Sequence, residues 1–443
     1  MSKRDFTKFP EPIFYTEKNR EGETVLGNIR FSDDAESCRY ISSQPVVDDV
    51  ITVPDGINIV RHIIHPRITA VAIPSSVHTI GYYAFTVLYG HTTYEGYYTP
   101  EMDDPIGNDL HKRLKTVILS EGLRTIKERA FACMMALTGI KLPKGLECIE
   151  EEAFMSCHGL NEIIIPASVR TLEFGAFSNC SGIKKAIFFD GIETLPPNLF
   201  YKNTSLTELK LPQTLKRIDE YSFSCCKSLP EVDLPDSVTE ICGGAFYGCN
   251  SLTEFTFKHD ITMGEGVFTN CENLTSFNIQ ADVKHPELLP YAPHLQSITT
   301  AKHHPDFITI DGAVYTKDKK TLVRVPHGIC GGFTVPRGVT AIGNRAFAEC
   351  RGITSVDLPS TVESIGEKAF YGCTAIENIT LGGKVKTVGD YAFAKCEKLN
   401  SLHVSQSVTK IGEGILLECG EMEITVSPGN PVYKTENGVI VKK

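Results

Sequence analysis

Large apolar residues recur along this chain at a fixed spacing of 23 positions, and a cysteine or a residue in its place follows each one three positions later. One step, from Phe246 to Phe268, is 22 positions. Phe85 opens the pattern and Leu416 closes it. A fixed period of this length indicates a repeat protein, in which each unit buries its core against its neighbours. The phenylalanines in regular register are Phe131, Phe154, Phe177, Phe200, Phe223, Phe246, Phe268, Phe347, Phe370 and Phe393.

One well-formed unit, residues 160–177, shows the local structure that each repeat predicts. Apolar residues two positions apart, Ile163 and Ile165, indicate a short strand with one buried face. Pro166 ends this strand because proline cannot donate a hydrogen bond to a sheet. Val169 points inward from a return segment, and the Gly-Ala-Phe sequence forms a tight turn or short helix. Each repeat therefore supplies one strand and one compact return, with the phenylalanines in a continuous interior row.

The full repeat, Leu-x-x-Ile-x-Ile-Pro-x-x-Val-x-x-Ile-Gly-x-x-Ala-Phe-x-x-Cys-x-x-Leu, resembles the BspA-type, or treponemal-type, leucine-rich repeat. Residues 356–373 and 71–85 match it best, and the resemblance covers residues 46–428. It implies an α/β solenoid: a right-handed leucine-rich repeat superhelix of about fourteen repeats with a parallel β-sheet on the concave face and short helical or 3-10 turns opposite. The family is associated with surface proteins and adhesins of host-associated bacteria, which implies binding rather than catalysis.

Interruptions of the repeat divide the chain into five predicted segments. Asp311-Gly312, between alternating apolar residues, predicts a β-hairpin inside the longer interruption, and Asn437-Gly438 repeats this signal near the end of the chain. The segments are residues 1–45, an N-terminal cap or partly disordered segment; 46–280, the first repeat block, with a loop insertion at 89–113; 281–332, an irregular insertion with the β-hairpin; 333–428, the second repeat block; and 429–443, a C-terminal capping strand or hairpin.

The two repeat blocks differ at one position of the return segment. The second block has glycine after the last apolar residue of each return, whereas the first block mostly has charged residues there, such as Lys127 and Glu150. The return turns of the two blocks are therefore expected to differ in geometry. The glycines are Gly343, Gly366, Gly389 and Gly412.

Nine of the fifteen cysteines follow the repeated apolar residue by three positions. Stacked repeats hold equivalent Cβ vectors parallel, which does not suit a disulfide. Zinc needs ligands that converge from different directions, and the chain has no Cys-x-x-Cys pair. We interpret these residues as free cysteines that act as small buried hydrophobic side chains. They are Cys157, Cys180, Cys226, Cys249, Cys271, Cys350, Cys373, Cys396 and Cys419.

Composition and charge restrict the class of partner. With 44 Lys and Arg against 54 Asp and Glu, the net charge is −10, and no basic cluster offers a surface for nucleic acid. No stretch approaches the roughly 18 apolar residues of a membrane span, so no membrane insertion is expected. No apolar stretch follows the basic residues at the N-terminus. This predicts a cytoplasmic protein; a surface or secreted location would require unconventional export or a removed leader.

Catalytic motifs are missing from the sequence. There is no Gly-x-Ser-x-Gly elbow, no phosphate-binding glycine-rich loop and no His-Glu-x-x-His. The histidine pairs His303-His304 and His62-x-x-His65 have no acid or cysteine at a matching spacing. We therefore predict a protein that is not an enzyme, with no cofactor and no metal site.

Candidate partner-binding residues lie on the outward face of the predicted strands and in the first loop insertion. Exposed isoleucines beside a column of acids would suit a partner with a basic, partly apolar surface, and tyrosine-rich loops suit protein recognition. The alternative is that isoleucine and glutamate here only form and solubilise the strands. The candidates are Glu162, Ile164, Ile187, Glu208, Lys210, Glu231, Asp233 and Glu254, with Tyr94, Tyr97 and Tyr98 in the loop.

Three functions remain open on the sequence. The first is a non-enzymatic protein–protein interaction scaffold that binds an unknown protein on the concave repeat surface, with a monomer favoured. The second is a cell-surface adhesin or glycan-binding protein of a host-associated microbe, which would want exposed aromatic residues on the sheet; the outward columns contain none. The third, an enzyme with a site in residues 281–332, would need a polar cluster that the histidines alone do not supply.

The cysteine interpretation gives a first prediction. The protein is expected to fold normally in reductant, because thiols that act as buried apolar groups need no oxidation. Mass spectrometry of the denatured, alkylated protein should then find no disulfides. Several native disulfides would contradict both the buried-thiol interpretation and the cytoplasmic assignment.

Overall fold

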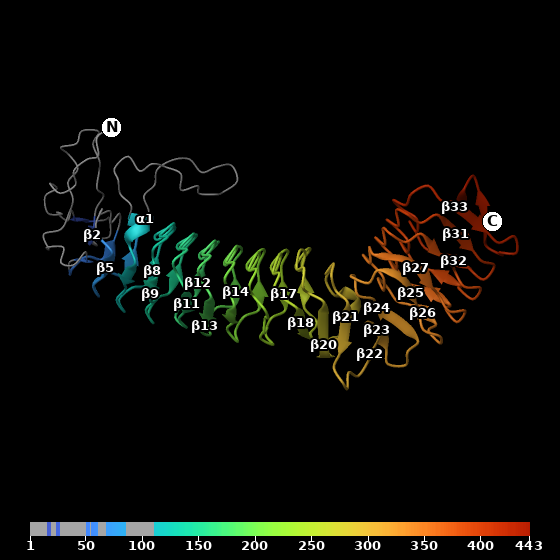
Figure 1. Cartoon of the computed structure of the whole chain (residues 1–443), viewed down its shortest axis with the longest axis horizontal. Helices are drawn as coiled ribbons and strands as arrows, with labels where there is room; N and C mark the ends of the chain where they lie inside the picture. The colour runs from blue at the N-terminus through green and yellow to red at the C-terminus, as the bar shows by residue number, and fades with distance from the viewer. Residues whose placement is uncertain (1–15, 19–23, 27–49, 54, 61–67, 86–109) are drawn as a thin grey trace. The chain divides into compact units, whose positions relative to one another are not determined.

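The computed structural model describes a β-solenoid made of two compact units (Figure 1). Unit 1 contains residues 1–229 and 233–238, and unit 2 contains residues 230–232 and 239–443. The residues described are 16–18, 24–26, 50–53, 55–60, 68–85 and 110–443.

Most turns of the coil carry two short strands, where the sequence pattern predicts only one. The first holds the Ile-x-Ile segment, with Ile163 and Ile165 pointing inward as expected. The second is a two-residue strand in the segment interpreted as an irregular return. It forms because buried peptide groups need partners and the fixed period brings equivalent groups into register. Thus Glu147 N donates to Arg124 O (2.8 Å), and Arg170 N donates to Glu147 O (2.9 Å).

In unit 1 both strands of each turn join parallel ladders. The first-strand sheets have the orders β3-β5-β7-β9 and β11-β13-β15, formed by β3 (Val50–Thr52), β5 (Ala70–Ala72), β7 (Thr116–Ile118), β9 (Gly139–Ile140), β11 (Glu162–Ile165), β13 (Lys185–Phe188) and β15 (Glu208–Lys210). The second strands are β4 (Ile59–Val60), β6 (Thr79–Ile80), β8 (Thr125–Ile126), β10 (Cys148–Ile149), β12 (Thr171–Leu172), β14 (Thr194–Leu195) and β16 (Arg217–Ile218). The antiparallel pair β1 (Thr16–Lys18) and β2 (Thr24–Leu26) continues their sheet next to β4.

Unit 2 repeats this arrangement, with hairpins added. Its first strands are β18 (Glu254–His259), β20 (Ser276–Asp282), β21 (Ser297–Thr300), β25 (Gly331–Thr334), β27 (Ile353–Asp357), β29 (Asn378–Ile379), β31 (Ser401–Val404) and β33 (Glu423–Val426). Its second strands are β17 (Glu240–Ile241), β19 (Thr262–Met263), β26 (Ala341–Ile342), β28 (Ser364–Ile365), β30 (Thr387–Val388) and β32 (Lys410–Ile411). The antiparallel strands are β22 (Phe307–Ile310), β23 (Ala313–Thr316), β24 (Thr321–Arg324), β34 (Tyr433–Glu436) and β35 (Val439–Lys442).

Both hairpins form at the Asx-Gly signals. Ile310 pairs with Ala313 across Asp311 and Gly312, and both turn residues have positive φ (48° and 79°), as a tight hairpin turn requires. β24 then pairs antiparallel with β23 and parallel with β26, so the insertion joins the second-strand sheet. The hairpin β34–β35, at the C-terminal end of the chain, turns at Asn437-Gly438 in the same way.

The corner that holds the repeated phenylalanine is not the short helical or 3-10 turn expected from the resemblance. Two residues around Phe154 have left-handed backbone, Glu152 (φ 51°) and Ser156 (φ 59°), and equivalent positions recur in most turns. Left-handed residues cost about 1–2 kcal/mol each outside glycine and cannot continue a right-handed helix. Hydrogen bonds to the next turn offset this cost, such as Phe154 N to Ala176 O (2.8 Å). The helices among the described residues are α1 (Leu110–Arg113) and the 3-10 segment η2 (Pro286–Leu288).

The repeated phenylalanines form the predicted interior row. In unit 1 each fully buried ring stacks on the next, with interplanar angles of 8–14° and centroid distances of 4.7–5.8 Å. The rings of Phe347, Phe370 and Phe393 stack in the same way in unit 2.

The cysteine column has a hydrogen-bonding role as well as an apolar one. The Cys157 thiol donates to Phe131 O, one turn earlier, at 3.1 Å, and Cys180 donates to Phe154 O at 2.9 Å. The same bond recurs in unit 2, for example from Cys396 to Phe370 O at 3.2 Å. All fourteen cysteines among the described residues are free thiols. The small side chain therefore fills the corner and supplies a donor to a buried carbonyl.

The glycine column of the second block reflects a close approach between turns. At Gly389 an added Cβ would lie 2.5 Å from Glu367 N and 2.6 Å from Gly366 C. No side chain fits at that separation. The first block holds charged residues at the equivalent position, where the Lys127 ammonium pairs with Glu150. Left-handed residues follow this position by two and six places in both blocks, as Arg129 and Cys133 do after Lys127 and as Arg345 and Glu349 do after Gly343. The expected difference in turn geometry therefore stays a prediction.

Asn203 occupies a cysteine position of the column and leaves a polar group unpaired. Its side chain is fully buried, and Oδ1 accepts from Cys180 N at 2.7 Å. Its Nδ2 has no hydrogen-bond partner in the part of the chain that the structure describes. A buried donor without a partner costs roughly 1–3 kcal/mol.

Replacing Asn203 by cysteine is therefore expected to raise the free energy of unfolding by about 1 kcal/mol, because the unpaired amide is removed. The Cys180 N–H, which loses Oδ1 as its acceptor, should then bond to Phe177 O, as Cys157 N does to Phe154 O. The reciprocal change, Cys226→Asn, should lower it by about 1–3 kcal/mol by creating the same defect one turn later. Urea unfolding of both variants measures the two shifts, compared at equal m-values. A loss of stability in Asn203→Cys would contradict the assignment.

Candidate binding surfaces

The outward side chains of the first strands in unit 1 form two aligned columns. Glu162, Lys185 and Glu208 are register partners across β11, β13 and β15. The second column joins Ile164, Ile187 and Lys210. Burial alternates along β11, with Glu162 and Ile164 exposed and the isoleucines between them and after them buried.

An apolar face lies within the second column. Ile164 is 41% exposed, and its neighbour Ile187 is half-buried. Ile118, at the end of β7, is 57% exposed. Phe189, which follows β13 directly, is 51% exposed and lies on the same side as Ile187 if the alternation continues one step past the strand. The sequence analysis missed Phe189; the signal was the second phenylalanine of Phe188-Phe189. We call Ile164, Ile187 and Phe189 the apolar face; the exposed Lys141 stands at the equivalent position of the turn between Ile118 and Ile164.

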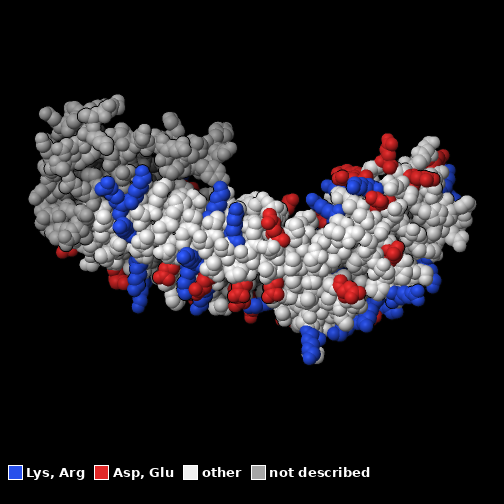
Figure 2. Space-filling view, viewed as in Figure 1, with Lys and Arg blue, Asp and Glu red and all other residues white. Residues whose placement is uncertain are grey.

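Charges around this face are mixed in sign. The Lys185 ammonium lies 2.6 Å from the Glu208 carboxylate, so the column that contains Glu162 and Glu208 is not purely acidic. An exposed pair of this kind contributes little stability. In the view of Figure 2, Lys, Arg, Asp and Glu lie chiefly toward the margins of each unit, with uncharged surface between them.

The remaining acidic candidates are exposed but do not share one sheet. Glu231 and Asp233 lie between β16 and β17, outside any strand, and Glu254 begins β18. Asn278 Nδ2 donates to Glu254 Oε2 at 3.2 Å. Because Glu208 belongs to unit 1 and Glu254 to unit 2, a continuous acidic strip stays a prediction. The loop tyrosines lie outside the described residues: Tyr94, Tyr97 and Tyr98.

His304 has a structural role. Its ring is 1% exposed, Nε2 lies 3.2 Å from Val283 O, and Nδ1 accepts from Asp306 N at 3.2 Å. Both ring nitrogens are therefore engaged with the backbone, which leaves no free nitrogen for a metal ion. His62 and His65 lie outside the described residues.

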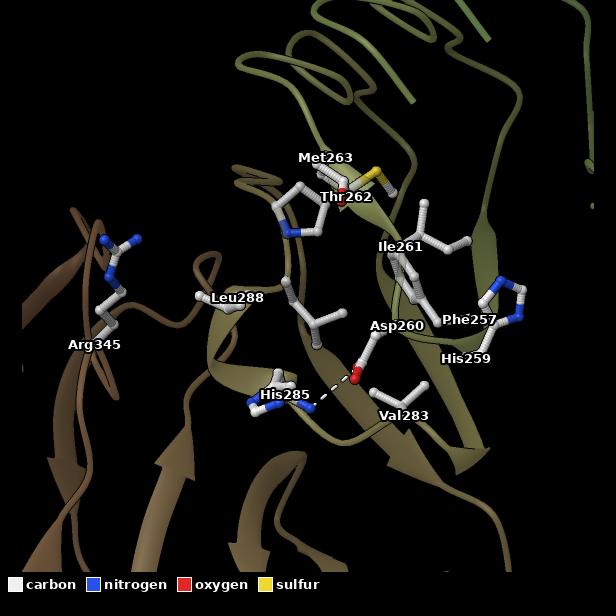
Figure 3. A pocket seen from close by; sticks show the side chains of 12 residues that line it. Phe257, His259, Asp260, Ile261, Thr262, Met263, Val283, His285, Leu288 and Arg345 are labelled. Carbon is white, nitrogen blue, oxygen red and sulfur yellow. Dashed lines mark hydrogen bonds between the residues drawn. The ribbon is translucent and has the colours of Figure 1, made fainter. Parts of the chain in front are cut away.

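Two adjacent hollows lie in unit 2, around the segment that contains η2. They share lining from Leu288, Pro290 and Arg345, and their volumes are about 350 and 390 Å³. Figure 3 shows the first, in which Leu288 on η2 lies between Arg345 and the strand residues. At its base His285 N donates to Asp260 Oδ1 at 3.1 Å.

The second hollow is lined in part by a buried arginine. Arg324, at the end of β24, is 4% exposed. Its Nη1 donates to Arg345 O (2.6 Å), and Nη2 donates to Leu289 O (3.2 Å) and to His327 Nε2 (2.7 Å). Its Nε has no hydrogen-bond partner among the described residues. Burial lowers the pKa of this guanidinium, which stays protonated at neutral pH.

His327 must be neutral in this arrangement. Arginine can only donate, so Nε2 offers its lone pair to Arg324. Burial lowers the pKa of His327 well below its usual value, and the positive charges of Arg324 and Arg351 lower the pKa further.

Residues 110–206, 193–287 and 330–435 match the family model described as the BspA type leucine rich repeat region, in six copies. These matches span more than half of the sequence, and the chain therefore belongs to the BspA-type leucine-rich repeat family. Such proteins are typically interaction or surface proteins. No curated protein matches the chain.

Solved structures of repeat proteins align over most of the chain. A leucine-rich repeat protein from Bacteroides ovatus is 19% identical, covers 93% of this chain and 92% of its own, and has a TM-score of 0.45. A leucine rich cell surface protein from Faecalibacterium prausnitzii is 19% identical, with coverages of 94% and 89% and a TM-score of 0.31. The pneumococcal vaccine antigen PcpA is 17% identical, with coverages of 94% and 83% and a TM-score of 0.32.

The helices that the structure describes fall short of the length and hydrophobicity of a membrane span.

Acid should destabilise the protein through His327. Its folded pKa lies below the unfolded value of about 6.5, so the unfolded chain takes up the proton first as pH falls. Stability is then lost from about pH 6.5 downward, by up to roughly 1.4 kcal/mol per pH unit for this group. His327→Gln keeps an acceptor for Arg324 and cannot titrate.

Urea unfolding of the wild type and of His327→Gln between about pH 7 and pH 5 measures how the free energy of unfolding of each depends on pH. The slopes of the two plots should differ by an amount that corresponds to the uptake of close to one proton on unfolding. Superimposable pH profiles would show that His327 does not carry the effect.

Proposed function

We propose that the chain is a non-enzymatic protein-binding scaffold and that its partner docks on the outward face of the first strands in unit 1. The apolar face carries this proposal. Apolar side chains on a surface strand lose contact with water only when something covers them, and contiguous apolar patches rimmed by polar groups mark interaction sites. Ile164 and Ile187 are register partners, so their exposed surface is continuous.

The rim indicates the chemistry of the partner. Glu162 is exposed beside Ile164, and Glu208 lies beyond Lys185. Lys185 offsets the charge of Glu208, so within unit 1 the exposed carboxylate of Glu162 favours a basic residue of the partner beside the apolar centre. Contacts of the partner with Glu231, Asp233 and Glu254 are a separate prediction. Rim charges of this kind mainly accelerate association, whereas buried apolar anchors slow dissociation.

The surface adhesin or glycan-binding alternative has one residue in its favour. Phe189 is an exposed aromatic side chain at the end of β13, which the predicted columns did not contain. One aromatic ring offers little area for stacking against a sugar. We therefore treat glycan binding as one outcome of the test below and not as a second proposal.

A capture experiment with matched variants tests the scaffold proposal. The baits are wild-type protein, Ile164→Lys, a Glu208/Glu231/Glu254→Lys triple variant, and the control Val439→Lys, which places the same charge on an exposed residue of unit 2 (54%). A partner that uses this face should be retained by the control and lost by Ile164→Lys. With purified partner, Ile164→Lys should weaken the Kd at least about tenfold, or 1.4 kcal/mol.

If the triple variant still captures the partner and Ile164→Lys does not, the binding site is restricted to the apolar face and does not include the three acidic residues. Equal capture by all baits, or capture of glycans and no protein, would overturn the proposal.

A further inference from the structure

The second hollow of unit 2 combines unusual charge with an aromatic wall. It is about 390 Å³ in volume and is formed by the chain around η2 together with the corners of two later turns, which contribute Arg345 and Tyr371. All its lining residues belong to unit 2. A hollow of this size suits a small-molecule ligand rather than a protein partner.

Among the described residues no carboxylate forms an ion pair with Arg324, whose pKa is lowered by burial although the charge of Glu349 acts to raise it. Every acceptor of this buried guanidinium is neutral: two backbone carbonyls and the Nε2 of His327. Its Nε is unpaired in the described part of the chain. A buried charge is costly unless an opposite charge or a full set of hydrogen bonds compensates it. A bound anion would compensate it here, because Arg324 lines the open hollow.

The acids near the hollow are already engaged. Glu349 lies 2.9 Å from the Arg351 guanidinium, and Glu287 lies 3.1 Å from His285 Nδ1. Arg345 is exposed and lines both hollows, and no ion pair involves it among the described residues. The charged lining of the hollow is Arg324, Arg345 and Lys368 against Glu287 and Glu349, which leaves one positive charge in excess. Arg345 is the exposed guanidinium that a ligand can reach.

Part of the lining of this hollow is apolar. Leu288 is 59% exposed, although it is a large aliphatic residue. The ring of Tyr291 is held edge-on against His327 (5.1 Å) and under the Arg351 guanidinium (5.1 Å). Such fixed surfaces favour a ligand with a ring or short apolar part beside its charge. A planar carboxylate matches the donor fork of Arg345, and the apolar lining suits a carboxylate carried on a ring better than a bare phosphate.

We propose that this hollow binds a small organic carboxylate carried on a ring or short apolar group. Arg345 forms the ion pair with the carboxylate, Arg324 supplies buried positive charge behind it, and Tyr291 and Leu288 cover the apolar part. This site is independent of the protein-binding face of unit 1 and adds a small-molecule ligand to the functions of the chain.

Ligand-observed NMR titration of the full chain tests the proposal. The probes are phenylacetate and other aromatic and alicyclic carboxylates, each paired with its neutral amide, and inorganic phosphate as a bare anion. At least one carboxylate should bind with a Kd below about 1 mM, and its amide should bind at least about tenfold more weakly.

Arg345→Gln removes the accessible charge and should raise the Kd of that carboxylate at least about tenfold. Arg337→Gln is the matched control, because Arg337 is an exposed arginine of the same unit that lines neither hollow; its Kd should equal that of the wild type. The proposal fails if no carboxylate binds, if amides bind equally well, if phosphate alone binds, or if Arg345→Gln leaves the affinity unchanged.

Discussion

Hydrogen bonds between the backbones of successive turns fix every other feature of this coil. On the second-strand side, donors point to the preceding turn, as from Glu147 N to Arg124 O; at the phenylalanine corner they point to the following turn, as from Phe154 N to Ala176 O. All these ladders require equivalent peptide groups to lie one period apart. The insertion at residues 89–113 precedes the first strand of its turn, and the pairing of β5 with β7 continues across it. The period is therefore a backbone requirement first, and the stacked phenylalanines follow from it.

The same requirement explains the cysteines. The carbonyl of most corner phenylalanines accepts one backbone N–H, as Phe154 O does from Cys157 N, and a second lone pair remains for the thiol of the next turn, such as Cys180. A thiol is small enough to fit there and still donate, as Cys180 does. Burial raises the pKa of Cys350 and of Cys396 to about 12, so these thiols keep the proton that they donate. Asn203 matches the size only approximately, and its amide nitrogen finds no acceptor among the described residues.

The periodic features could be predicted from the sequence, and the exceptions could not. Spacing alone gave the stacked row, the free thiols and the turn at Asp311-Gly312, because each depends on neighbours in sequence or one period away. The second strand of each turn was not predicted because a strand of two residues shows no alternation of apolar and polar positions. The conformation of the corner was predicted wrongly because residues with left-handed backbone, such as Glu152, are not of a type that indicates it. The second hollow of unit 2 could not be predicted from the sequence for a different reason. Leu288, Arg324 and Arg345 come from three segments whose packing depends on the insertion, and Arg324 ends a strand whose pattern gives no reason to expect burial on both sides.

Within a regular coil, each inward position is set by the turn before it, so binding must use positions where the repeat leaves a choice. Such positions are of two kinds here. Outward residues are free of the packing requirement, and the choice of isoleucine at 118 and 164 leaves apolar area exposed that stability does not need. Inward residues of the insertion are free of the period, and there the chain buries Arg324, whose register equivalent in the next turn is the exposed Asn344. Exposed apolar area and buried uncompensated charge both raise the free energy of the unbound protein, and in each case a complementary ligand would lower it. The apolar face of unit 1 and the charged hollow of unit 2 differ in chemistry, so each would be stabilised by a different class of ligand, a protein on the face and a small carboxylate in the hollow.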